Sequence, residues 1–364
     1  MCLSKRLLLL FIILTLASCK VEQSATLERY TPTDINDRWT VSTLSKEGIN
    51  TDKILSMMQA IEKGEYHGIS SILIAKNGKL VFEAYPGKFK RDEIHTTRSA
   101  GKSITSALVG IAIDKGFIDS VHEPILPYFP EYQGSITHWD KRKNNITIKH
   151  LLTMTSGVKG NEDKMYPTND WTKFYLDQPL QYSPGQHFSY ATSGVVVLGN
   201  VITRASGLRI PEFANQYLFQ PLGITQYKWP ITNSRGNQGL AMTGGGLNLT
   251  PRDMLKFGQL YLNQGIWNGN RILSEAWIKE STQQHVVSDL YGEGYGYLWR
   301  IVERKYGQKK VKSIEAWGNG GQFIMVIPSL SLVTVFTGEN YGKFPETEQP
   351  FELLERYILF ALEV

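Results

Sequence analysis

The spacing of apolar residues changes along the chain, and each change predicts a different kind of element. Apolar residues recur at helical intervals over residues 52–61. Two runs rich in β-branched and aromatic residues follow at 69–75 and 80–85, and they flank Asn77-Gly78, a dipeptide typical of tight hairpin turns. The pattern therefore predicts a short helix followed by an antiparallel hairpin.

Between the hairpin and about residue 240, apolar residues recur mostly at helical intervals. Turns rich in serine, glycine and proline separate these segments. The predicted helices cover residues 103–115, 148–154, 194–205 and 211–217. We therefore expect the middle of the chain to be mostly helical.

The last third of the chain begins with one more helix and then becomes rich in strands. Thr250 suits the N-cap of a helix over 251–262, and Pro251 suits its first position. The predicted strands cover 296–302, 322–327 and 331–337, followed by a terminal helix over about 351–362. Strands from both ends most simply share one sheet. We therefore expect an α+β fold: a central antiparallel sheet, flanking helices and a mostly α-helical insert.

The N-terminus has the features of a targeting segment. Lys5 and Arg6 precede an apolar run over 7–16, which is shorter than the roughly 20 residues of a membrane-spanning helix. The next residues, 16–19, read Leu-Ala-Ser-Cys, a small-residue cleavage site with a cysteine just after it. This pattern resembles a bacterial lipoprotein signal, which implies cleavage before Cys19 and a lipid on its thiol.

On that interpretation, residues 1–18 are a signal peptide and residues 19–38 are an acylated cysteine with a polar tether. The mature protein would be anchored in the cell envelope, in the periplasm or on the outer face of a bacterial membrane. The alternative is an ordinary secretory signal or a membrane anchor with a chance cysteine.

Charge and cysteine content exclude several classes of function. The chain carries a net charge of +5, and removal of residues 1–18 takes away two cations and no acid, leaving +3. So balanced a charge argues against a nucleic-acid partner. Only Cys19 would remain, so no disulfide is expected within the chain. Histidines and cysteines form no metal-binding motif, and no phosphate-binding glycine loop follows a strand, so neither metal nor cofactor is expected.

Ser99 and Lys102 are the first candidates for chemistry. They are three residues apart, so a helix places them on one face. A serine hydroxyl needs a base to become a nucleophile, and a lysine amine in a dry pocket can accept its proton. The same spacing arises by chance. Ser156 and Lys159 repeat it where a helix is expected to stop, and we expect that pair to be structural.

Two further stretches could complete a site. Tyr190 lies just before a predicted helix and could act as an acid or base beside the lysine, or could simply pack on the core. Residues 317–322, Trp-Gly-Asn-Gly-Gly-Gln, enter an apolar strand. Glycines there would let a ligand approach backbone N–H groups, or would only make a turn. A Ser-His-Asp arrangement remains possible from spacing alone.

These motifs stand in the order found in penicillin-recognising serine hydrolases: Ser99-Ala-Gly-Lys102, Tyr190-Ala-Thr192, then the glycine-rich strand entry near residue 319. The sequence around these motifs also resembles the β-lactamase-related serine hydrolase family. The segments that carry the resemblance are SAGKSITSALVGIAIDKG, ITIKHLLTMTSGV, SPGQHFSYATSGVVVLGNVI, GGGLNLTPRDMLKFGQLYLNQG and VIPSLSLVTVFTG. The resemblance covers about residues 39–364. Its nearest branch contains 6-aminohexanoate-dimer hydrolase and EstB-like esterases, which are related to class C β-lactamases and DD-peptidases.

The resemblance implies a β-lactamase/transpeptidase-like fold and a role for each motif. One lobe would combine residues 39–98 with 241–364, and a helical lobe would cover 99–240. Ser99 would be the nucleophile, Lys102 the group that accepts its proton, and Tyr190 the partner acid or base. The backbone N–H groups of Ser99 and Gln322 would form the oxyanion hole. The residues expected to bind substrate are Thr192, Asn319, Gly320, Gly321 and Gln322.

The sequence departs from the family pattern at two positions. Thr192 stands where the family often has asparagine, and Asn319 stands near a position where the family often has lysine or histidine. The resemblance then implies a site without the cation that grips a substrate carboxylate. Such a loss should weaken β-lactams and D-Ala-D-Ala peptides more than esters or uncharged amides. An arginine from elsewhere, or Lys312, could compensate.

We therefore expect an envelope-anchored serine hydrolase that cleaves esters or small amides through an acyl-enzyme on Ser99. Its partners would be a small-molecule or cell-wall-derived substrate and the membrane that holds its lipid. A β-lactamase or DD-peptidase acting on β-lactams or peptidoglycan peptides is the first alternative. A non-catalytic envelope-binding protein with the same fold is the second.

Overall fold

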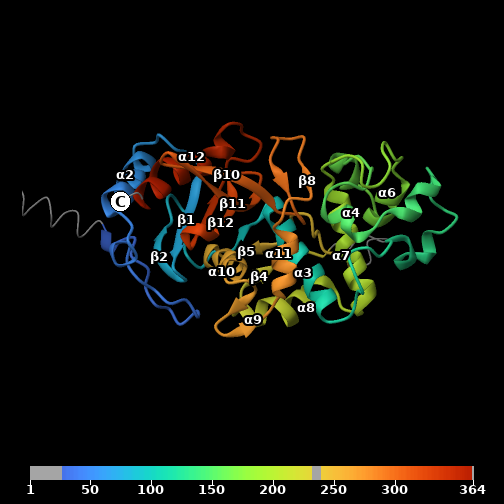
Figure 1. The fold of residues 1–364 in the computed structure, drawn as a ribbon, viewed down its shortest axis with the longest axis horizontal. Coiled ribbons are helices and arrows are strands. Elements are labelled where there is room, and N and C mark those ends of the chain that lie inside the picture. Colours follow the sequence, from blue (N-terminus) through green and yellow to red (C-terminus); the bar gives the residue numbers. More distant parts are fainter. Residues whose placement is uncertain (1–26, 232–238, 363–364) are drawn as a thin grey trace, which may run out of the picture.

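A computed structural model describes residues 27–231 and 239–362, and its centre is an antiparallel sheet (Figure 1). Within these residues the sheet has eight strands, which combine both ends of the chain as expected. Across the sheet they run β2 (Lys79–Ala84), β1 (Ile69–Lys76), β13 (Leu332–Gly338), β12 (Gln322–Ile327), β11 (Lys309–Gly318), β10 (Arg300–Tyr306), β9 (Gly294–Tyr295) and β8 (Val286–Val287). The N-terminal hairpin β1–β2 therefore continues the C-terminal strands through the β1–β13 pair.

Both faces of the sheet are covered at its centre, so the strands β1, β12 and β13 are buried on both sides. In β1, Ile72 and Ile74 join one apolar core, whereas Leu73 and Ala75 join the other, as the alternation of a strand requires. The first core lies under α2 (Thr51–Glu62) and the C-terminal helical segment. That segment runs from α12 (Gln349–Leu353) through a π-helical turn, Leu354–Leu359, to a 3-10 turn at Phe360–Leu362.

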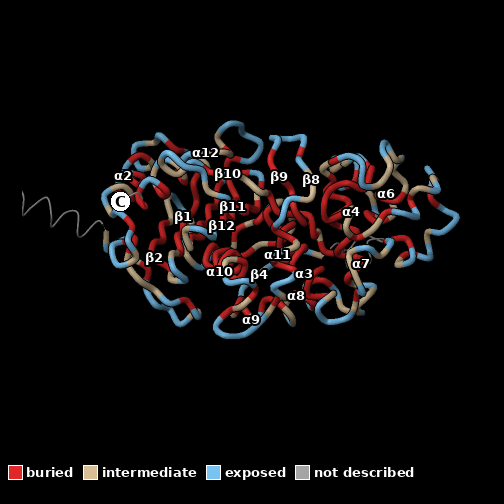
Figure 2. Tube along the Cα trace, in the orientation of Figure 1, coloured by how far each residue is buried: buried red, intermediate tan, exposed pale blue. Residues whose placement is uncertain are grey.

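The other face carries the helices that lead to the site. α10 (Pro251–Leu262) packs on β12 and β13, and the Thr250 hydroxyl caps it by accepting the Asp253 N–H at 3.2 Å. α3 (Gly101–Asp114) is buried over nearly its whole length beside it. α11 (Glu275–Ser281) packs against α3 through Trp277, which touches the glycine at 110. Figure 2 shows this buried interior running from the sheet into the helical part of the chain.

The helical part gathers beyond the β8 edge of the sheet in Figure 1. Its long helix is α7 (Thr192–Ser206), which packs on α3 and so joins the two parts. Four shorter helices pack on it: α4 (Ile148–Leu152), α5 (Glu162–Met165), α6 (Trp171–Asp177) and α8 (Ile210–Ala214). A π-helical turn at Asn215–Phe219 then leads from α8 to α9 (Gln220–Leu222), which lies below α10 in Figure 1.

Two small sheets complete the fold. In the first, β5 (Asn248–Leu249) pairs with both β3 (His95–Thr96) and β4 (Tyr227–Lys228). In the second, β6 (Ile266–Trp267) pairs with β7 (Asn270–Arg271). The first of these matters for the site, because β3 leads directly into the turn that carries Ser99.

The architecture is the expected α+β, β-lactamase/transpeptidase-like fold, but one predicted strand is wrong in position. The apolar run 296–302 does not form a single strand, because Leu298 adopts a left-handed φ of 61° and interrupts it. Tyr297 and Trp299 are buried in the core on either side of this bend, and β10 begins only at Arg300. The run is apolar because it is a buried turn.

The predicted signal peptide and Cys19 lie outside the described residues. Among residues 27–231 and 239–362, no helix combines the length and hydropathy that a bilayer crossing requires. The same residues contain no group of three or more histidine, cysteine or acidic side chains placed to hold a metal ion.

Candidate active site

A strained turn presents Ser99 at the entrance to α3. The residues Arg98–Ala100 form one 3-10 turn that runs into the helix, and Arg98 takes a φ of 46°, a left-handed conformation rare for a side chain of this size. Thr97 fixes the turn, because both its backbone N–H and its hydroxyl donate to the Leu247 carbonyl at 2.9 Å. Ser99 is left half-buried, with its hydroxyl next to open space.

Lys102 brings a buried amine to that hydroxyl. It lies one helical turn after Ser99 and is only 2% exposed. Its Nζ donates to Ser99 Oγ at 2.8 Å and to the Gly244 carbonyl at 2.6 Å. Among the described ion pairs, Lys102 has no carboxylate partner. The amine is therefore held on the serine by geometry, and no acid neutralises it.

Tyr190 lies on the other side of the same amine. The Lys102 Nζ is 4.9 Å from the centre of the Tyr190 ring, and this ring lines a cavity together with Ser99. Tyr190 is two residues ahead of α7, whose packing on α3 brings the two motifs together. The structure thus gathers Ser99, Lys102 and Tyr190 into one cluster.

Thr192 takes a less exposed place than the sequence suggests. It begins α7, is 1% exposed, and its hydroxyl donates to the Glu162 carboxylate on α5. Sequence reasoning missed Glu162, because α5 is short and nothing in its spacing ties it to the nucleophile. Glu162 and Thr192 line a second cavity that Ser99 also opens into.

The glycine-rich end of β11 lies directly against the nucleophile turn. A Cβ built at Gly318 would lie 2.4 Å from the Thr97 carbonyl oxygen and 3.1 Å from the Ala100 nitrogen. Asn319, the next residue, lines both cavities that contain Ser99. Its side-chain oxygen accepts the Gly342 N–H at 2.8 Å. The amide is uncharged, so Asn319 brings no positive charge to either cavity.

The side chain of Gln322 is bonded to the neighbouring strand, and the oxyanion role of its backbone N–H stays a prediction. Its side chain is fully buried and bonds to Gly338, donating to the carbonyl at 2.6 Å and accepting the N–H at 3.2 Å. Gln322 lines neither cavity that Ser99 opens into. Gly320 and Gly321 form the left-handed turn between the two strands, with φ of 95° and 96°, and the Gly320 N–H donates to Thr347 Oγ1. Within residues 317–322, Trp317, Gly318 and Asn319 line a cavity with Ser99, and Asn319 lines both.

The two cavities differ in chemistry. The first, which we name the aromatic pocket, has a volume of about 190 Å³. It is lined by Ser99, Tyr190, Leu290, Tyr291, Arg300, Trp317, Gly318, Asn319, Phe323, Phe344, Thr347, Glu348 and Phe351. The second, which we name the polar pocket, has a volume of about 340 Å³. It is lined by Thr96, Arg98, Ser99, Glu162, Tyr166, Thr192, Met242, Gly244, Gly245, Gly246 and Asn319.

Arg300 is a cation in the aromatic pocket that the sequence analysis did not place there. Its guanidinium lies 4.3 Å from the centre of the Trp317 ring and forms a buried ion pair with Glu293. Burial lowers the pKa of Arg300 from its ordinary value. Lys312, the other expected compensating cation, lines neither pocket, and its Nζ donates to the Thr282 carbonyl. Arg300 was not singled out from the sequence, because this residue lay inside the predicted strand 296–302 and belonged to no motif.

The wall of the aromatic pocket is itself anchored. Trp317 Nε1 donates to the buried Glu315 carboxylate at 2.6 Å, and Arg304 binds both oxygens of Glu315 at 2.8 and 2.7 Å. The ring of Phe351 lies 4.8 Å from that of Trp317. The aromatic pocket is thus a preformed, largely apolar site with fixed walls.

Comparison with known proteins agrees with this geometry. The family model described as β-lactamase matches residues 57–352. The 6-aminohexanoate-dimer hydrolase of Paenarthrobacter ureafaciens is 24% identical over 268 residues, covering 68% of this chain and 66% of the relative. The chain thus spans slightly less than two thirds of that relative's length.

Solved structures share the fold at low sequence identity. EstCE1, a hydrolase with promiscuous acyltransferase activity, superposes with a TM-score of 0.68 at 18% identity, covering 85% of this chain and 98% of that one. The octameric penicillin-binding protein homologue from Pyrococcus abyssi gives 0.65 at 19%, covering 83% and 76%. With the matched family model, these likenesses place the chain in the β-lactamase family of serine hydrolases.

Proposed function

We propose that this protein hydrolyses esters or small amides through an acyl-enzyme on Ser99. The observation that carries the proposal is the 2.8 Å hydrogen bond from the buried Lys102 amine to the Ser99 hydroxyl. In the reactive state the neutral amine takes the hydroxyl proton while Oγ bonds to the substrate carbonyl carbon. The family match supports the proposal, as does a relative that bears the name 6-aminohexanoate-dimer hydrolase.

The remaining steps use groups within reach of Ser99. The backbone N–H groups of Ser99 and Asn319 would stabilise the oxyanion, and each such donor is worth about 10²–10³ in rate. The proton then passes from Lys102, by way of Tyr190, to the leaving oxygen or nitrogen as its bond to carbon breaks. A water attacks the acyl-enzyme in the second half, and its proton returns Ser99 to the hydroxyl form.

The charges around Ser99 favour esters and uncharged amides over β-lactams. Asn319 supplies no positive charge on the strand beside the nucleophile, and the Arg300 guanidinium is already neutralised by Glu293. A substrate carboxylate in the aromatic pocket would therefore face an arginine that already has a carboxylate partner. A β-lactamase or DD-peptidase remains the second candidate, favoured by the family match and by the penicillin-binding protein homologue among the structural neighbours.

Pre-steady-state hydrolysis separates these candidates. The purified full chain and its Ser99→Ala variant are mixed with a chromogenic ester and with a chromogenic cephalosporin. We expect a burst equal in amplitude to the enzyme concentration with the ester only, absent in the variant. Fast turnover of the cephalosporin would instead favour the β-lactamase. Folded protein that gives no burst and no labelling by a fluorophosphonate would contradict an acyl-enzyme and favour a binding protein.

We further propose that the enzyme works in the bacterial cell envelope, held by a lipid on Cys19. The support is the sequence of residues 1–19, which joins a basic end and an apolar run to a cysteine. We expect Cys19→Ala to move the protein from the membrane fraction to the soluble fraction and to abolish incorporation of labelled palmitate. A protein that stays in the membrane without the cysteine would contradict the lipid anchor.

A further inference from the structure

The polar pocket holds a carboxylate that no described cation neutralises. Glu162 lines this cavity beside Ser99, and its one described hydrogen bond comes from the buried hydroxyl of Thr192. No ion pair involves Glu162 within residues 27–231 and 239–362. By contrast, the acids around the aromatic pocket are paired, Glu293 with Arg300 and Glu315 with Arg304.

Arg98, the other charged residue of the polar pocket, does not fill this role. Its guanidinium lies over the ring of Tyr341, a residue that does not line the polar pocket, 4.6 Å from the ring centre. Arg98 and Glu162 are not within ion-pair distance of each other in the described structure. Burial and the nearby Glu162 carboxylate raise the pKa of the Tyr166 phenol, and the Arg98 charge opposes them.

The Thr192–Glu162 pair also changes what the site offers to a substrate. An asparagine at position 192 would present a neutral amide that both donates and accepts. Thr192 instead donates to Glu162, which leaves the carboxylate as the group facing the cavity. A carboxylate can only accept hydrogen bonds, and it favours donors that carry positive charge.

We propose that the polar pocket binds an ammonium group of the substrate, and that Glu162 is the residue that accepts its hydrogen bonds. A primary ammonium has three N–H donors, of which one can reach the Glu162 oxygen that Thr192 leaves free. The aromatic pocket on the other side of Ser99 would take the apolar part of the same substrate. The inference rests on the proposed function, since it names the class of ester or amide that Ser99 cleaves.

The test compares substrates that differ only in charge. With the purified full chain, kcat/KM is measured for p-nitrophenyl 3-aminopropanoate and for p-nitrophenyl butanoate, in which a methyl group replaces the ammonium. A second pair carries the charge on the alcohol: 4-aminobutyl butanoate and pentyl butanoate, in which a methyl group again replaces the ammonium. We expect a preference of about tenfold for the cation in at least one pair, typical of a partly exposed charge-assisted hydrogen bond.

Two variants assign the preference to one residue. Glu162→Gln keeps the size of the side chain and an acceptor for Thr192, and we expect it to reduce the cation preference to about 1, the value for equal transition-state binding. Asp163→Asn removes the neighbouring charge on α5, which lines neither pocket, and should leave the preference as it is. A wild-type protein without a preference, or a preference that survives in Glu162→Gln, would overturn the inference.

Other outcomes separate this inference from the proposed function. If Glu162→Gln accumulates acyl-enzyme equally from charged and neutral esters, Glu162 moves a proton in deacylation and the binding role is wrong. If no ester is hydrolysed, the proposed function fails, and calorimetry still decides the inference. Ser99→Ala protein is then titrated with 3-aminopropanamide and butanamide, where tighter binding of the charged amide supports an ammonium site and equal binding excludes it.

Discussion

Gly318 shows at the scale of one residue how closely the end of β11 approaches the turn that carries Ser99. A Cβ at this position would lie 2.4 Å from the Thr97 carbonyl oxygen and 2.9 Å from Gln322 Cβ. The first of these atoms belongs to the backbone and cannot rotate away. The strand must then shift from the turn, and a displacement of about 1 Å at reacting groups can cost 10²-fold in rate.

We therefore expect Gly318→Ala to lower kcat for the chromogenic ester by about 100-fold or more. Single-turnover kinetics would show the loss in the acylation step, where the oxyanion first forms. Urea unfolding of the same protein serves as the control, because the fold should survive a local shift at the end of β11. Activity within threefold of wild type would mean that the strand does not set the geometry of the reaction.

Residues near each other in sequence were the ones that the sequence could place. Ser99 and Lys102 are three apart, and the helix α3 alone brings them together. Glu162 and Arg300 come from elements that only the tertiary fold brings to Ser99, and neither belongs to a motif. Gln322 stays a predicted oxyanion donor: both β11 and β12 contact the turn that carries Ser99, but Gln322 itself lines neither cavity there.

Helix α10 shows at the scale of one element how the sheet positions its covering helices. Gly258 allows the helix to lie close to β12 and β13, since a Cβ there would lie 2.6 Å from Val333 Cγ1 and 2.8 Å from Ile324 Cγ2. We expect Gly258→Ala to destabilise the protein by about 1–3 kcal/mol, because overpacking outweighs the better helix propensity of alanine. Urea denaturation measures the change.

Gly194→Ala on α7 is the matched control for this prediction. Its new Cβ would meet Leu151 Cδ2 at 3.4 Å and Tyr175 Cε2 at 3.6 Å, which are ordinary contacts. The same substitution should then be neutral or stabilising by up to about 1 kcal/mol, the propensity difference between the two residues. If both variants lose stability equally, the close approach of α10 to the sheet is not the reason.

Elements with clear end signals were predicted well, and those without them were not. Thr250 and Pro251 gave the start of α10, and Asn77-Gly78 gave the β1–β2 turn. The long strand β11 was missed because its first half, Lys309–Lys312, is charged and exposed at the sheet surface. Strand pairing with β10 and β12 determines its conformation, and such pairing cannot be read from local hydropathy.

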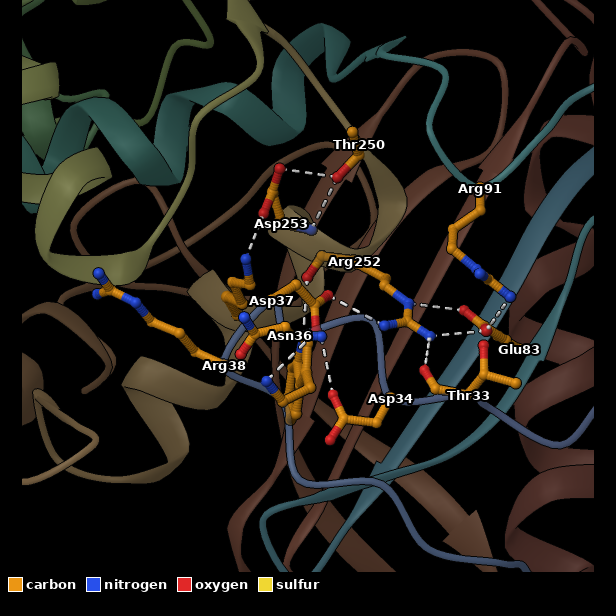
Figure 3. A network of polar contacts seen from close by, with 12 residues as sticks. Thr33, Asp34, Asn36, Asp37, Arg38, Glu83, Arg91, Thr250, Arg252 and Asp253 are labelled. Atoms are coloured by element: carbon orange, nitrogen blue, oxygen red, sulfur yellow. Dashed lines mark hydrogen bonds and ion pairs between the residues drawn. The ribbon is translucent and has the colours of Figure 1, made fainter.

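A buried charge network joins distant parts of the whole molecule (Figure 3). Arg252 on α10 binds both oxygens of Glu83 on β2 at 2.8 Å, and its Nη1 lies 3.0 Å from Asp37 Oδ2. Arg252 Nη2 also donates to the Thr33 carbonyl, and this hydrogen bond holds the segment before the first helix. Arg91 and Tyr85 complete the shell around Glu83. The N-terminal segment, an outer strand and a helix from late in the chain thus meet at one guanidinium.

We expect Arg252→Met to lower the free energy of unfolding by about 1–3 kcal/mol, because Glu83 would keep only the partly exposed Arg91 as a cationic partner. The double variant Glu83→Met/Arg252→Met should recover most of this loss, since apolar side chains of similar size can replace a buried ion pair at little cost. The Arg91 side chain, about one third exposed, can turn to water once Glu83 is gone. Urea unfolding of the three proteins measures the effect, with ester hydrolysis as a check that the site at Ser99 is intact. A double variant that is no more stable than Arg252→Met would contradict this explanation. The loss of stability would then come from the broken bonds to Thr33 and Asp37, which hold the N-terminal segment, and not from the Glu83 carboxylate left without Arg252.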